Sequence, residues 1–145
     1  MIEHLTIDGV AHRGDGIATS EGRNVYVPYT LPGETVEVNP TLAGSHFRIV
    51  DPSPDRIEPT CPLFGTCGGC ALQHMALPAY RHWKRNLVLD ALKAAFIETD
   101  VAGLIDAHGA GRRRATLHAR GGRIGFAASR SHEIIPLNHC PVCVP

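Results

Sequence analysis

The sequence has 145 residues, of which 43% are hydrophobic and 19% charged, and its formal net charge is zero. This length and apolar content suit one ordinary domain or two small ones and exclude a wholly disordered chain. No run approaches about 18 apolar residues, so no membrane-spanning helix is expected. The first residues lack the basic and apolar segments of a secretory signal, and we expect a cytoplasmic protein.

The neutral total hides an uneven distribution of charge. Residues 1–60 carry nine acidic residues and four arginines, residues 61–106 carry four acidic and four basic residues, and residues 107–145 carry six arginines and one glutamate. Of the 14 basic residues, 12 are arginine, whose planar guanidinium matches phosphate groups. The basic end is therefore either a nucleic-acid surface or an ordinary solvated surface.

Short β-type segments separated by turns fill the first fifty residues. They cover residues 5–7, 24–27, 35–38 and 46–50. Four or five short strands between Gly and Pro turns are typical of a small barrel or sandwich. Residues 51–55 contain two prolines, which prevent a regular ladder and predict a linker.

The strongest helix pattern covers residues 78–96. Pro78 suits a first helical turn, and steps of three and four residues produce one apolar stripe of Tyr80, Trp83, Leu87, Ala91 and Ala94. Lys84 and Arg85 lie largely off this stripe. Their side chains are either solvated or in contact with phosphate.

Residues 115–127 predict a β-hairpin, because Gly121-Gly122 fits a tight turn between two strands. Residues 133–137 predict one more strand. Arg112, Arg113 and Arg114 lead into the hairpin, where alternation directs the first and third to one face. Such arginines either pair with RNA phosphates and stack on splayed bases or form structural ion pairs. Further arginines extend the patch, at positions 120, 123 and 130.

Five cysteines lie at positions 61, 67, 70, 140 and 143. An odd number without a secretory signal argues against a disulfide framework. Three thiols fall within ten residues, in a loop whose glycines permit tight turns, and a fourth ligand must come from Cys140 or Cys143. Four thiolates hold either zinc or an iron–sulfur cluster.

The spacing leaves the metal open. Zinc would pair the two Cys-x-x-Cys knuckles, Cys67 with Cys70 and Cys140 with Cys143, and would leave Cys61 unused. An iron–sulfur cluster would use all three loop cysteines and one distal cysteine, and the spacing favours this interpretation. Thiols without metal are the third alternative.

Several short motifs follow one another along the whole chain. They are IDG at 7–9, GDG at 14–16, VYVP at 25–28, LPGE at 31–34, PSPDRI at 52–57, CGGC at 67–70, LQH at 72–74, RRA at 113–115, IGF at 124–126 and CPV at 140–142. In this order they resemble the N-terminal part of the RNA uracil-5-methyltransferases that carry a TRAM domain and a [4Fe–4S] cluster. The cysteine loop is the most specific part of the resemblance.

The resemblance implies a mixed β and α/β protein. An OB-like TRAM β-barrel would cover residues 1–51, a linker residues 52–60, and a small α+β iron–sulfur-binding domain residues 61–145, which is expected to be incomplete at its C-terminal end. Carried over by position, the cluster ligands would be Cys61, Cys67, Cys70 and Cys140. Cys143 falls where the family usually has an apolar residue and would be a spare thiol.

The resemblance also implies a function in RNA recognition. The partner would be rRNA or tRNA, and the contacting residues would be Lys84, Arg85, Arg112, Arg113, Arg114, Arg123 and Arg130. In the family, methyl transfer belongs to a C-terminal Rossmann-like domain that binds S-adenosylmethionine. We expect that domain to lie outside this sequence, so the chain alone is predicted to be inactive, with no catalytic residue, monomeric and without membrane contact. The alternatives are a free-standing zinc- or iron–sulfur-binding module that binds RNA or protein, and a ferredoxin-type electron carrier.

Overall fold

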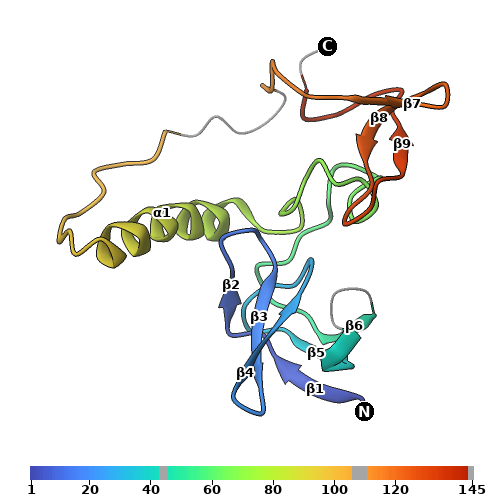
Figure 1. Cartoon of the computed structure of the whole chain (residues 1–145). Helices are drawn as coiled ribbons and strands as arrows, with labels where there is room; N and C mark the ends of the chain where they lie inside the picture. The colour runs from blue at the N-terminus through green and yellow to red at the C-terminus, as the bar shows by residue number, and fades with distance from the viewer. Residues whose placement is uncertain (43–45, 106–110, 144–145) are drawn as a thin grey trace. The chain divides into compact units, whose positions relative to one another are not determined.

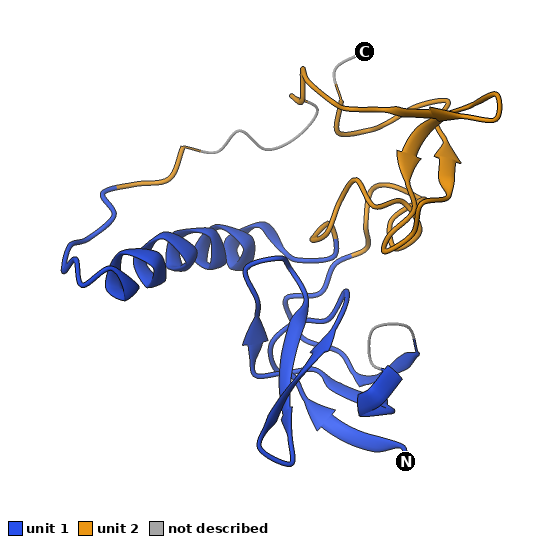
Figure 2. Ribbon diagram, in the orientation of Figure 1, with its two compact units in different colours: residues 1–57, 74–102 blue, residues 58–73, 103–145 orange. Residues whose placement is uncertain are grey.

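The computed structural model describes residues 1–42, 46–105 and 111–143. In these residues the chain forms three small antiparallel sheets of three strands each and a single α-helix (Figure 1). The contacts divide the chain into two compact units (Figure 2). Unit 1 comprises residues 1–57 and 74–102, and unit 2 comprises residues 58–73 and 103–145.

Unit 1 contains two of the sheets. The first has the strand order β1-β5-β6, with β1 at Glu3–Thr6, β5 at Thr35–Val38 and β6 at Phe47–Asp51. The second has the order β2-β3-β4, with β2 at Gly9–Val10, β3 at Gly16–Ser20 and β4 at Arg23–Val27. A short 3-10 helix at Pro40–Leu42 follows β5.

The core of unit 1 draws on both sheets. Alternation places Val36 and Val38 inside on β5 while their neighbours are only half-buried. The full cluster, with Phe47 and Ile49 packed against it, consists of Leu5, Ile7, Ala18, Val25, Val27, Val36 and Val38. One apolar core shared by two small sheets explains why these short strands form a stable unit.

Two details of unit 1 differ from the sequence prediction. Strand β3 was not predicted, because its sequence Gly-Ile-Ala-Thr-Ser has few of the large β-branched or aromatic residues that mark a strand. Its inward side chain is only Ala18, which is completely buried. Asp51 begins the proline-containing segment 51–55 but closes the barrel range 1–51 that the resemblance implies. In the structure it is the last residue of β6, where it pairs with Thr35.

The helix α1 runs over Leu77–Ala94, close to the predicted range, and Pro78 lies in its first turn. It belongs to unit 1, where the indole Nε1 of Trp83 donates a hydrogen bond of 3.1 Å to the carbonyl oxygen of Val10. No residue of α1 is fully buried, so the predicted apolar stripe is only partly covered. Among the described residues, no helix combines the length and apolarity that a bilayer crossing requires.

Unit 2 contains the third sheet, in the order β7-β8-β9, with β7 at His118–Arg120, β8 at Arg123–Ala127 and β9 at Ile134–Pro136. The predicted Gly-Gly turn is confirmed, since Gly121 and Gly122 have φ angles of 58° and 76°. The first strand of the hairpin begins at His118 instead of residue 115. The reason is that the cysteine loop occupies the edge of β8 further on, where Cys67 pairs with Ala128.

Both units combine segments that are far apart in the sequence. The division into residues 1–51, 52–60 and 61–145 stays a prediction. Within unit 1, the two segments are joined by backbone hydrogen bonds from Ile57 to the carbonyl of His74 (2.9 Å) and from Ala76 to that of Asp55 (2.8 Å).

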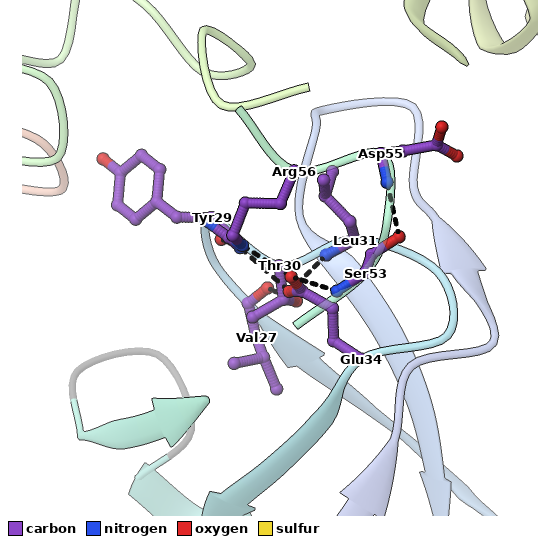
Figure 3. A network of polar contacts seen from close by, with 8 residues as sticks. All are labelled: Val27, Tyr29, Thr30, Leu31, Glu34, Ser53, Asp55 and Arg56. Atoms are coloured by element: carbon purple, nitrogen blue, oxygen red, sulfur yellow. Dashed lines mark hydrogen bonds and ion pairs between the residues drawn. The ribbon is translucent and has the colours of Figure 1, made fainter. Parts of the chain in front are cut away.

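An ion pair within unit 1 joins the buried Glu34 to Arg56, which lies in the predicted linker (Figure 3). The Glu34 side chain is completely buried and accepts hydrogen bonds from Arg56 Nε and Nη2 at 2.5 and 2.9 Å. It also accepts from the backbone N–H groups of Leu31 (2.9 Å) and Ser53 (3.2 Å). Burial acts to raise the pKa of Glu34, but the hydrogen bonds from Arg56, Leu31 and Ser53 outweigh it and hold this pKa below its usual value.

His74 lies in the same unit and is completely buried, with its ring edge-on to Tyr29. Burial, followed by the positive charge of Arg56, lowers the pKa of His74 from 6.5 to about 4. The folded protein therefore holds this imidazole neutral at pH values at which the unfolded chain already binds a proton.

We expect acidification to destabilise unit 1 because of this difference. Between about pH 6.5 and pH 4 the unfolded chain binds more protons at His74, so the free energy of unfolding falls as the pH falls. The loss from this residue would approach about 3 kcal/mol. Urea unfolding at pH 7, 5.5 and 4, followed by the fluorescence of the single tryptophan, measures it.

The matched variant is His74→Gln, which keeps a polar side chain of similar size but cannot titrate. Its stability should depend much less on pH between 6.5 and about 4.5. Equal pH slopes in the wild type and the variant would contradict the assignment. The lowered pKa of Glu34 adds a further loss, common to both proteins, as the pH falls below about 4.5.

Candidate functional site

The cysteine loop of unit 2 is folded by its own backbone. The N–H of Phe64 donates to the carbonyl of Cys61 (3.0 Å), and the N–H of Cys67 donates to the carbonyl of Leu63 (2.8 Å). Gly65 adopts a φ of 87°, which favours glycine. These turns bring the segment after Cys61 back toward its own start, as the glycine content predicts.

The loop is attached to the end of β8. Gly68 N–H donates to the carbonyl of Ala127, and Ser129 N–H donates to the carbonyl of Thr66, both at 2.9 Å. A side chain at position 68 would place its Cβ only 2.8 Å from the Ala127 oxygen. Glycine is therefore required at this position for the loop to reach the sheet.

All four predicted metal ligands line one cavity in unit 2. They are Cys61, Cys67, Cys70 and Cys140. The cavity has an empty volume of about 380 Å³, which includes space open to solvent. The structure thus brings together a distal thiol and three loop thiols that are about seventy residues earlier in the sequence.

The walls of this cavity are mostly apolar, with few polar groups. Leu63, Phe64, Phe126 and Leu137 supply apolar surface, and Gln73 is one of the polar residues. Gln73 Oε1 accepts a hydrogen bond of 3.1 Å from the N–H of Cys61. The sequence analysis missed this role of Gln73, although the residue lies within the LQH motif that carried part of the resemblance.

Cys143 lies beside Cys140 in a tight turn, in which its N–H donates to the Cys140 carbonyl at 3.2 Å. Hydrogen bonding to the Cys140 side chain, followed by burial and the neighbouring charges of Cys140 and Cys70, raises the pKa of Cys143, and the positive charge of Arg112 partly opposes the shift. The fifth thiol is therefore close to the predicted ligands.

The chemistry of this donor set fits a thiolate-bound metal centre. All five cysteines are free thiols, and four of them share the cavity. Within the described part of the chain, no three Cys, His, Asp or Glu side chains lie close enough together to hold a single metal ion. Ligands of a [4Fe–4S] cluster bind four separate iron atoms and need not meet at one point. The ligand assignment stays a prediction.

The three consecutive arginines differ in their surroundings. Arg112 lines the cysteine cavity, and its N–H donates to the carbonyl of Val142 at 3.2 Å. Arg113 and Arg114 are exposed and lie several residues before β7. The prediction that they lead directly into the first hairpin strand is therefore wrong. All three arginines are exposed, and Arg112 alone also lines the cavity that the thiols share.

Two more arginines face each other across the Gly-Gly turn. Arg120 on β7 and Arg123 on β8 are directly paired in the register, and both are exposed. Like charges in this position repel and destabilise the hairpin, and a bound anion would relieve the repulsion. Arg130 and His118 line a second, more open cavity next to β8.

The two predicted contact residues on α1 are engaged within the chain. The Lys84 ammonium lies over the rings of Tyr80 and Trp83, at 5.6 and 5.1 Å from their centres. Arg85 forms an ion pair with Asp100. Neither contact prevents the side chain from binding phosphate, but each gives the residue a structural role within the chain.

Comparison with known proteins shows that the chain is similar to RNA methyltransferases. No family model matches the chain, whereas curated RNA methyltransferases match it over nearly its whole length. The chain is therefore related to the RNA methyltransferases, and the resemblance to the RNA uracil-5-methyltransferases is confirmed. The chain spans only about a third of the length of these relatives.

Three relatives illustrate the match. An uncharacterized RNA methyltransferase of Caulobacter vibrioides is 41% identical over 99% of this chain and 37% of its own length. One from Brucella suis is 43% identical over 97% of this chain and 35% of its own length. The 23S rRNA (uracil(1939)-C(5))-methyltransferase RlmD of Halomonas elongata is 37% identical over 97% of this chain and 32% of its own length.

A solved structure shares the fold. The crystal structure of the Pyrococcus abyssi tRNA (uracil-54, C5)-methyltransferase, in complex with S-adenosyl-L-homocysteine, matches with a TM-score of 0.60. The match covers 97% of this chain and 33% of that one, with 23% sequence identity.

Proposed function

We propose that this chain is the RNA-recognition and iron–sulfur-binding portion of an S-adenosylmethionine-dependent RNA uracil-C5 methyltransferase. The observation that carries the proposal is the similarity over nearly the whole chain to RNA methyltransferases, including two named as 23S rRNA uracil-C5 methyltransferases at 37% identity. These names favour rRNA over tRNA as the substrate. Methyl transfer belongs to parts of such a protein that this chain does not match.

The fold of each unit supports separate functions for the two units. Unit 1 carries two three-stranded antiparallel sheets around one apolar core, which is compatible with an OB-like TRAM barrel. Unit 2 carries the cysteine cavity and six of the chain's arginines. We therefore assign metal binding and the main RNA contacts to unit 2.

Cys61, Cys67, Cys70 and Cys140 would hold a [4Fe–4S] cluster. When bound with four thiolates, the cluster supplies a rigid cross-link and leaves no iron open to substrate. The protein's own residues then do the remaining work: β8 supports the loop through Gly68, and the guanidinium of Arg112 balances negative charge at the sulfurs. The contact between Cys143 and Cys140 favours a second candidate, a zinc site built from the two Cys-x-x-Cys knuckles.

Metal and acid-labile sulfide analysis of the chain purified without oxygen tests the centre. We expect about four iron and four sulfide per chain, with a brown colour, and Cys67→Ala should remove both. One zinc per chain without sulfide or colour would overturn the cluster in favour of the zinc site.

RNA binding is tested at the paired arginines. We expect Arg120→Gln together with Arg123→Gln to weaken binding to a fragment of 23S rRNA around the uracil named for the RlmD relatives. The slope of log K against log salt concentration should become less steep by about 1.4, since two phosphate contacts on single-stranded RNA are lost. Because the cross-strand repulsion disappears, the melting temperature should stay the same or rise.

A lower affinity for RNA together with an unchanged or higher melting temperature would show that the double variant loses RNA contacts and does not misfold. Arg81→Gln on α1 is the matched control and should leave the salt slope unchanged. An unchanged slope in the double variant would rule out phosphate contacts at the hairpin. The wild type should bind the rRNA fragment more tightly than a tRNA transcript that contains uridine. Equal affinities for the two RNAs would contradict the preference for rRNA.

A further inference from the structure

A second thiol lies next to the distal cysteine of the cavity. Cys140 lines the cavity, and Cys143 is held next to it by the turn whose closing hydrogen bond is 3.2 Å long. The two residues between them, Pro141 and Val142, also line the cavity. The turn therefore keeps Cys143 beside the wall to which Cys140 belongs.

Cys143 also has a relation to the loop on the other side. It lies near enough to Cys70 for the charges of the two sulfurs to interact. Cys70 is one of the three loop thiols that line the cavity, and Arg112, which pairs with Cys143 in a β-bridge, lines the same cavity. The backbone at Cys143 is therefore attached to a residue of the cavity wall.

The position of Cys143 does not depend on the Cys140 side chain. The turn is closed by backbone groups, and a further backbone hydrogen bond of 3.2 Å from Arg112 to Val142 attaches the segment to residue 112. Arg112 and Cys143 also form a parallel β-bridge. Loss of the Cys140 thiol would therefore leave the backbone that presents Cys143 in place.

We propose that Cys143 is a reserve ligand of the metal centre, which takes the place of Cys140 when the Cys140 thiol is missing or blocked. This inference rests on the proposed metal-binding function of the cavity. The two sulfurs are chemically equal donors, and the exchange needs side-chain rotation within one turn and no change in the fold. It differs from the zinc site, in which Cys140 and Cys143 would both be ligands at the same time.

The test compares the iron and sulfide content of alanine variants of this 145-residue chain, purified without oxygen. We expect Cys143→Ala to bind as much iron as the wild type, and Cys140→Ala to retain more than half. The iron content of the double variant Cys140→Ala/Cys143→Ala should be at least five-fold lower than that of the wild type. Cys67→Ala, the control for a ligand without a reserve, should show the same loss of iron. Cys140→Ser, which preserves the packing of the site more closely, should behave like Cys140→Ala.

Alkylation with iodoacetamide followed by mass spectrometry gives an independent readout. In the loaded wild type we expect only Cys143 to be modified, because the four ligands are protected. In loaded Cys140→Ala and Cys140→Ser, Cys143 should become protected. Modification of Cys143 in these loaded variants would overturn the inference, because the centre would then be held by three cysteines.

The outcomes separate this inference from the proposed function. If the wild type is loaded but both Cys140 variants are as empty as the double variant, the reserve role is wrong and the metal centre stands. If Cys143→Ala alone loses the metal, Cys143 is a primary ligand and the reserve role is again wrong. A wild type without iron, sulfide or zinc would overturn both.

Discussion

Replacement of Glu34 by alanine is expected to destabilise unit 1 by about 3–5 kcal/mol, because it leaves the half-buried Arg56 guanidinium without its counter-charge. The same change removes the acceptor for the N–H groups of Leu31 and Ser53, which are also buried. Urea unfolding followed by tryptophan fluorescence at pH 7 gives the loss of free energy directly.

The matched control lies on β5 at Glu37, which also accepts a hydrogen bond from an arginine, Arg48, at 2.8 Å. Here both side chains are in contact with water, with exposed fractions of 31% and 68%, so Glu37→Ala should cost far less stability than Glu34→Ala. Similar losses in the two variants would show that burial is not what gives the Glu34 pair its effect. The metal content of both variants should equal that of the wild type.

If unit 2 binds the proposed cluster, its removal is expected to unfold much of this unit. Among its described residues, the only buried side chains larger than glycine are Cys67 and Ile134. So small an apolar core does not offset the entropy cost of ordering the segment, whereas metal binding contributes directly to the free energy of folding. Backbone amides of β8 and β9 should change from protected to rapidly exchanging in hydrogen–deuterium exchange.

The experiment uses the full chain before and after the cluster is oxidised with ferricyanide and the iron is chelated. Strands β3 and β5 provide the internal control, because the core of unit 1 contains no cysteine and their protection should be unchanged. Equal protection of β8 with and without metal would show that the hairpin folds without a cross-link. Cys67→Ala should reproduce the metal-free pattern without any chemical treatment.

The elements with strong local signals were predictable from the sequence. Pro78 and the apolar spacing gave α1 nearly to the residue, and the glycine pair gave the turn between β7 and β8. The strand β3 was not predicted, because its inward residue is a small alanine, which by itself does not indicate a strand. The true start of β7 also escaped, because a loop fifty residues earlier takes the edge of β8.

The candidate site was predictable as a set of residues and not as an arrangement. The spacing of the cysteines grouped the three loop thiols with one distal thiol, and the resemblance implied that the distal one is Cys140. The structure places these four thiols in one cavity. The pairing of Arg120 with Arg123 followed from the turn position, once the register was known. The orientation of Arg112 toward the cavity did not follow, since it depends on a backbone hydrogen bond to a residue thirty positions later.

The discontinuous build of the two units also sets an order of events during synthesis. Unit 1 has its last residue at position 102, while unit 2 still needs the segment that begins at 103. Cys140 follows Cys70 by 70 residues, which a ribosome adds in roughly 4–14 s at about 5–20 residues per second. During that interval the loop offers three thiols without the fourth. The proposed cluster would therefore receive its full set of ligands late, after the strands of unit 1 and the helix α1 have been synthesised.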